Sequence, residues 1–104
     1  MIQHKGKYRE EAEALIRAAE MDPSLSVLDL HGSCRDEAVR NLDFFLDQGV
    51  CQGIPVVRII HGKGTGTLRE TVIRFLASHP SVVAFRGSDR PDELGAVVYV
   101  VLHA

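Results

Sequence analysis

The chain has 104 residues and a formal net charge of −2, with 45% apolar and 25% charged residues. This length supports a single domain, and a chain of this size buries roughly 65% of its unfolded surface, so its core needs no disulfide or metal. No apolar run approaches the roughly 20 residues of a membrane span, and no charged segment precedes an apolar one near Met1. We therefore expect a cytoplasmic protein that does not bind membranes.

The cysteine count and the charge narrow the possible functions further. The two cysteines, Cys34 and Cys51, are too few for a disulfide scaffold and lack the spacing of a zinc site, so we expect free thiols. The mild negative charge argues against binding nucleic acid through a global positive field. Any nucleic-acid site must therefore be local.

Residues 6–21 have the pattern of an amphipathic helix that ends near Asp22-Pro23. Its apolar stripe consists of Tyr8, Ala12, Leu15, Ile16 and Ala19. An isolated helix of this length is not stable in water, so it should dock on the domain or on a partner. We treat residues 1–25 as this helix and a linker, and residues 26–104 as the domain.

From residue 26 onward, strand and helix patterns alternate. Ser33, with Asp36 three residues later, is the expected N-cap of the first helix in this region. The expected elements are a strand at 27–31, a helix to about 48, a strand at 56–61, a helix at 67–78, and strands at 82–86 and 96–102. The order of elements is thus a leading helix followed by βαβαββ.

This order predicts an α/β fold in which the first two strands are parallel, because a helix connects them. In the last strand, the residues that point to either face of the sheet are apolar, which is typical of a strand inside a sheet. We expect this strand to run antiparallel to its neighbours. The expected architecture is an α+β two-layer sandwich, with two helices on one face of a four-stranded mixed sheet.

Both early strands end in His-Gly immediately before a helix, at His31-Gly32 and at His61-Gly62. The ends of parallel strands share one rim, where open α/β sheets bind ligands. Each helix start adds unpaired backbone N–H groups and a partial positive charge. The expected ligand is a phosphate.

The second of these turns is rich in glycine, which lets the backbone approach an anion closely. Lys63 and Arg69 add positive charge at the same corner. The sequence is neither a Walker loop nor GxGxxG, and glycine-rich turns also occur simply as sharp corners. The expected phosphate-binding residues are Gly32, Gly62, Lys63, Gly64, Thr65, Gly66 and Arg69.

Asp29 and His31 lie two residues apart on a strand and therefore point to the same face of the sheet. A carboxylate can orient an imidazole so that it acts as a general acid or base near neutral pH. The alternative is that Asp29 only ties down the turn that follows it. His79, at the end of a helix before Pro80, is expected to have a structural role, as a partly positive ring that complements the helix dipole.

Together, Leu28–Gly32, Glu37-Ala38 and Ile60–Arg69 resemble the Smr (small MutS-related) domain, and the resemblance covers about residues 26–102. It implies a fold similar to the C-terminal domain of translation initiation factor three. It also implies nucleic-acid binding and, in many members, endonuclease activity on DNA or RNA. Many members have a Gly-Gly-x-Gly segment before the last strand, whereas residues 92–97 keep only Gly95, and we expect the carboxylates of Asp92 and Glu93 to repel a phosphate backbone there.

The leading hypothesis is a small stand-alone Smr protein that cleaves nucleic acid. His31 and His61 would serve as acid and base, and Asp29 would orient His31 or position water. The sequence has no carboxylate cluster typical of a two-metal nuclease, so we expect no metal and no cofactor.

The rival hypothesis is a module that binds nucleic acid or the ribosome without cleavage. The altered segment 92–97 favours it, as does the lack of aromatic residues for base stacking beyond Tyr8 and Tyr99. The choice between DNA and RNA, and the oligomeric state, stay open.

Overall fold

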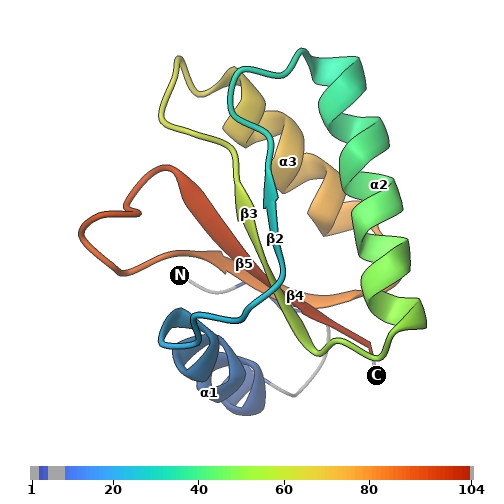
Figure 1. Cartoon of the computed structure of the whole chain (residues 1–104), viewed down its shortest axis with the longest axis vertical. Coiled ribbons are helices and arrows are strands. Elements are labelled where there is room, and N and C mark those ends of the chain that lie inside the picture. The colour runs from blue at the N-terminus through green and yellow to red at the C-terminus, as the bar shows by residue number, and fades with distance from the viewer. Residues whose placement is uncertain (1–2, 5–8, 104) are drawn as a thin grey trace.

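A mixed β-sheet separates helices on its two faces (Figure 1). The computed structural model describes residues 3–4 and 9–103. The helices are α1 (Arg9–Glu20), α2 (Arg35–Cys51) and α3 (Thr67–Ser78). The strands are β1 (Gln3–His4), β2 (Val27–Asp29), β3 (Val56–Ile60), β4 (Val82–Gly87) and β5 (Val97–Leu102), in the order β1-β4-β5-β3-β2.

The pairing of the strands confirms the main prediction from the sequence. Strand β2 is parallel to β3, and β5 lies between β3 and β4, antiparallel to both. All six residues of β5 are buried, which explains why the residues on both faces of this strand are apolar. The two-residue strand β1, which the sequence did not predict, pairs with β4 at the edge and makes a fifth strand.

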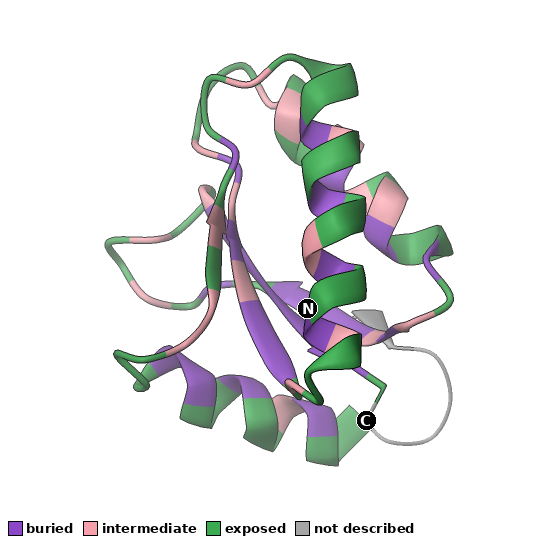
Figure 2. Ribbon diagram, turned by 45° about the vertical axis from the view of Figure 1, so that its right-hand side comes forward, coloured by how far each residue is buried: buried purple, intermediate pink, exposed green. Residues whose placement is uncertain are grey.

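Helices α2 and α3 cover one face of the sheet, as expected. Figure 2 shows α2 buried on the side toward the sheet and exposed on its outer side. The residues of the two helices that were predicted to face the core do so. Phe45, Leu68 and Phe75 are partly buried and pack against the edge of the core cluster. The fully buried ones are Ala38, Leu42, Leu46, Val72 and Leu76.

Helix α1 docks on the opposite face of the sheet and adds a third layer to the predicted two-layer domain. Ala12, Ile16 and Ala19 pack in one cluster with residues of β3, β4 and β5. Leu15, from the same predicted stripe, is 40% exposed. Tyr8 lies outside the described residues. The sequence left open whether this helix binds the domain or a partner, and the packing shows that it binds the domain.

A buried ion cluster also holds α1 in place. Nε of Arg86, on β4, donates to the Glu13 carboxylate at 2.9 Å, and its Nη2 donates to Oε1 of Glu20 at 3.1 Å. Burial raises the pKa of Glu20, but hydrogen bonds from Arg86 and from the Asp89 N–H outweigh it and leave the pKa below its usual value. In the part of the chain that the structure describes, no helix has the length and apolar character needed to span a bilayer.

We expect Ile16→Ala to destabilise the protein by about 2–5 kcal/mol, because Ile16 is fully buried between α1 and the sheet. Leu15→Ala is the matched control and should cost less than about 1 kcal/mol, since this neighbouring side chain is partly exposed. Urea denaturation followed by circular dichroism measures both values. Equal losses for the two variants would contradict the packing of α1 on the sheet.

Candidate functional site

The two His-Gly turns meet at one rim of the sheet, as the parallel pairing of β2 and β3 requires. The backbone N–H of Leu30 donates to the Ile60 carbonyl at 2.7 Å, immediately before the two turns. A groove of about 520 Å³ opens at this rim between the N-termini of α2 and α3. It is lined by all of the predicted phosphate-binding residues and by both histidines: His31, Gly32, His61, Gly62, Lys63, Gly64, Thr65, Gly66 and Arg69.

The two turns are in close contact at Gly62. This residue has a φ of +82°, and a Cβ at its position would come within 3.0 Å of Cβ of His31. Both the left-handed backbone and the short approach therefore require glycine. The glycine brings the second turn against the first histidine.

Both helices that start at the groove lack a side-chain cap among the described residues. The N-cap of α2 is Cys34, whose side chain makes no hydrogen bond to a backbone N–H of the helix, and the N-cap of α3 is Gly66, which has no side chain. The prediction of Ser33 as the N-cap is wrong by one residue, because the turn at Gly32 extends one residue further before helical geometry begins. The first N–H groups of both helices therefore lack a capping side chain at the groove, where they favour an anion.

Asp29 and His31 form the expected pair. Nδ1 of His31 and Oδ1 of Asp29 are 2.6 Å apart, and the His31 backbone N–H donates to the same oxygen at 3.1 Å. The hydrogen bond from the His31 ring holds the pKa of Asp29 below its usual range. The Asp29 carboxylate thus both stabilises the turn, through the backbone N–H of His31, and orients the His31 ring. With Nδ1 bound to a carboxylate, Nε2 is the ring nitrogen left for a ligand.

His61 has a different environment, although the local sequence around it is similar. It is buried, and its Nδ1 donates to the Gly62 carbonyl at 2.8 Å. Burial lowers the pKa of His61 below its usual value, and the charge of Arg69 lowers it further. A carbonyl only accepts hydrogen bonds, so the proton of the neutral ring is on Nδ1 and Nε2 is unprotonated.

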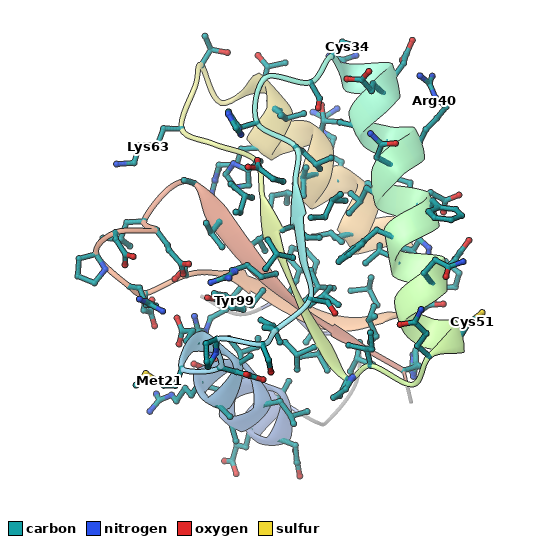
Figure 3. All side chains as sticks on the ribbon, viewed as in Figure 1. Met21, Cys34, Arg40, Cys51, Lys63 and Tyr99 are labelled. Carbon is teal, nitrogen blue, oxygen red and sulfur yellow. The ribbon has the colours of Figure 1, made fainter. Side chains whose placement is uncertain are left out.

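The cations of the site lie on its exposed margin. Figure 3 shows Lys63 extending from the glycine-rich loop into solvent. Arg35, the first residue of α2, also lines the groove, and the sequence analysis missed it. Its position offered a signal, because a cation at the positive end of a helix dipole is unfavourable unless an anion binds nearby.

In the segment before β5, where we expected carboxylates to repel a phosphate, Glu93 does not line the groove and is held by other side chains. Its carboxylate accepts hydrogen bonds from Ser88 Oγ at 2.7 Å, Tyr99 Oη at 2.9 Å and Arg58 Nη1 at 3.1 Å. Asp92 is exposed and lies 3.5 Å from Nε of Arg90. Tyr99 is fully buried, so it offers no surface for base stacking.

The same segment supports the second His-Gly turn. The Ala96 carbonyl accepts hydrogen bonds from the backbone N–H of His61 at 2.9 Å and from that of Gly62 at 3.0 Å. Gly95, the glycine shared with the Smr pattern, has a φ of +76°. The segment therefore differs in sequence from the Smr pattern that the chain resembles but still holds the second His-Gly turn in place.

A second cluster of polar residues lies at the far end of α3. Nε2 of His79 is 3.5 Å from Oδ1 of Asp43 and 3.8 Å from Oδ1 of Asp47. The Ser81 N–H donates to Nδ1 of His79, which places the ring proton on Nε2, facing the carboxylates. A metal ion would need Nε2 without its proton, so in this arrangement the ring faces the two carboxylates through an N–H group and not as a metal ligand.

Comparison with known proteins gives the family. The sequence matches the Smr domain over residues 28–103. It is 42% identical over 81 residues to Endonuclease MutS2 of Thermomicrobium roseum, and 45% identical over 73 residues to that of Symbiobacterium thermophilum. These alignments cover 78% and 70% of this chain but 10% and 9% of those proteins. The chain thus spans about a tenth of the length of these curated relatives.

Solved structures agree with this match. The Smr domain of Thermus thermophilus MutS2 superposes with a TM-score of 0.71 at 32% identity, covering 77% of this chain and 100% of that one. YdaL, a stand-alone small MutS-related protein from Escherichia coli, superposes with a TM-score of 0.86 at 22% identity, covering 99% of this chain and 82% of that one. The YdaL match shows a shared fold that includes the leading helix. With the family match over three quarters of its length, the chain belongs to the Smr domain family.

Proposed function

We propose that this Smr protein binds nucleic acid at the rim groove and cleaves its phosphodiester backbone. The proposal rests on one observation: two histidines that line a single anion groove have opposite electrostatic surroundings. His31 is paired with a carboxylate, whereas His61 is buried and has its pKa lowered by that burial. Such a difference suits one residue to give a proton and the other to take one.

The groove is suited to hold one phosphate of the backbone. The N–H groups at the starts of α2 and α3, which have no capping side chain, and the charges of Lys63 and Arg69 would bind its oxygens. The name Endonuclease MutS2 of the relatives supports nuclease chemistry, although their Smr region is a small part of each protein. The activity is therefore proposed for this domain from its own residues.

His61 acts as the base and His31 as the acid in the proposed reaction. On RNA, Nε2 of His61 takes the proton of a 2′-hydroxyl while that oxygen attacks phosphorus. Protonated His31 gives its Nε2 proton to the departing 5′ oxygen. One P–O bond forms as the other breaks, which leaves a 2′,3′-cyclic phosphate and a 5′-hydroxyl.

Asp29 positions His31 and does not touch the substrate in this scheme. Its carboxylate holds Nδ1 of His31, so that Nε2 is the nitrogen presented to the leaving group. The backbone amides of the groove stabilise the extra negative charge that develops on the phosphate oxygens. On DNA the 2′-hydroxyl is absent, and His61 would have to activate a water molecule instead.

Incubation of the pure protein with labelled single-stranded RNA, single-stranded DNA and supercoiled plasmid, with and without EDTA, tests the proposal. We expect cleavage of RNA, with cyclic phosphate ends, that persists in EDTA because both proton transfers use side chains. Binding without cleavage of any substrate would instead support the rival hypothesis of a binding module. Cleavage that EDTA abolishes would overturn the acid–base assignment.

We expect Lys63→Ala to weaken nucleic-acid binding and to lower the slope of log K against log salt by about 0.7–0.9, the value for one lost phosphate contact. Titrations by fluorescence anisotropy at several salt concentrations give this slope. The cleavage rate at saturating protein should change little. An unchanged slope would show that the glycine-rich loop does not face the backbone.

We expect His31→Ala and His61→Ala each to reduce the cleavage rate by about 10²- to 10⁴-fold while largely sparing affinity. Single-turnover rates and binding constants must be measured separately, since a histidine that only contacts phosphate would affect both. Asp29→Asn should keep the fold and lower the rate, because an amide holds the His31 ring in position less firmly than a carboxylate does. Parent-like rates for both alanine variants would contradict the mechanism.

The pH profile of cleavage should be bell-shaped, with its acidic limb set by His61. A base must be unprotonated to act, so the rate rises as the pH increases through its pKa. Burial lowers that pKa, and the limb should therefore lie below the usual value of 6.5. Arg69→Gln removes a charge that lowers the pKa, so it should move the limb to higher pH. A shift in the opposite direction would exclude His61 as the base.

A further inference from the structure

A second groove continues from the rim along α3. It has a volume of about 560 Å³ and lies between α2 and α3, which run side by side over one face of the sheet (Figure 1). Arg35, Thr67 and Thr71 line both this groove and the rim groove. The two depressions therefore adjoin each other at the N-termini of the two helices. A chain molecule bound at the rim could pass directly into the second groove.

The wall that α3 contributes is a polar stripe along the length of the helix. Its polar residues follow the helical spacing of three and four, and end at Ser78, the last residue of α3. Val39 and Phe75 supply apolar surface between the helices. A helix of 12 residues is about 18 Å long, which equals the rise of about five stacked nucleotides.

The charges in this groove favour a polyanion. Arg35 lines it from the positive end of α2, where a cation lowers helix stability unless it meets an anion. Arg74 lines it near the middle of α3 and binds Glu70 at 2.7 Å, with exposed fractions of 79% and 63% for the two side chains. Such an exposed pair adds little stability, so Arg74 is able to exchange Glu70 for a phosphate.

We propose that the groove between α2 and α3 is a second binding site for single-stranded nucleic acid, in which Arg35 and Arg74 hold phosphates beyond the one at the rim. The inference rests on the proposed function, because the strand would enter from the histidine rim. A single strand fits better than a duplex, since Val39 and Phe75 are suited to contact unpaired bases, which a duplex hides. The site would select substrates by length and by strandedness.

Binding of 2′-O-methyl oligoribonucleotides of 3 and 12 nucleotides tests the inference, because these lack the 2′-hydroxyl nucleophile. Fluorescence anisotropy at constant salt gives the affinities. We expect the parent protein to bind the 12-mer more tightly than the 3-mer. Arg74→Ala should weaken binding of the 12-mer about three- to tenfold and lower its salt slope by about 0.7, while leaving the 3-mer unchanged. Arg74→Lys should restore most of the loss.

Arg40→Ala is the matched control. Arg40 is an exposed arginine of α2 that lines neither groove, and Figure 3 shows it extending away from the body of the protein. Its removal should leave both affinities unchanged. Glu70→Gln should tighten binding of the 12-mer and leave binding of the 3-mer unchanged. The substitution removes a negative charge from the groove and breaks the ion pair that holds Arg74. Circular dichroism of each variant confirms the fold.

The outcomes separate this inference from the proposed function. Equal affinity of the parent for both lengths, or an equal effect of Arg74→Ala and Arg40→Ala on the 12-mer, would overturn the second site and leave the rim intact. Failure of the parent to bind either oligonucleotide would overturn both. A 12-base-pair duplex that competes as well as the single 12-mer would overturn the preference for a single strand.

Discussion

The parallel pairing of β2 with β3, in the register that places Asp29 opposite Ile60, is the constraint on which the site depends. Because both strands run in the same direction, their His-Gly turns, and the starts of α2 and α3, fall at one edge of the sheet. The register also assigns Leu30 to the core and leaves Asp29 exposed. A slip of one residue would reverse these positions and remove the partner of His31 from the rim.

Strand β5 supports this rim from the other side. It enters the sheet between β3 and β4, so the chain immediately before it passes over the end of β3 and offers the Ala96 carbonyl to the His61 turn. Glu93 fixes that segment to β3 and β5 through Arg58 and Tyr99. At the departure from the family pattern, the chain thus has a part-buried, hydrogen-bonded anchor.

The sequence predicted the elements with strong periodicity and the meeting of the two turns, because local patterns and the rule for parallel strands determine both. It did not predict which surface α1 covers, since an amphipathic stripe such as that of Ile16 shows that a face is buried but not against what. The inward turn of Glu93 also escaped prediction. Its partners, Arg58 and Tyr99, lie 35 and 6 residues away and meet it only after the sheet has formed.

The same limit applies to the two histidines, whose local sequences are nearly alike. His31 follows β2, an edge strand, and its ring is exposed and bound to a carboxylate. His61 follows β3, an inner strand; its backbone N–H binds the Ala96 carbonyl, and burial of its ring lowers its pKa. Strand order, which neither motif encodes, therefore gives the two histidine rings different exposure and different partners. The proposed division of roles into an acid and a base would follow from this difference, because one copy of the motif lies at the edge of the sheet and the other inside it.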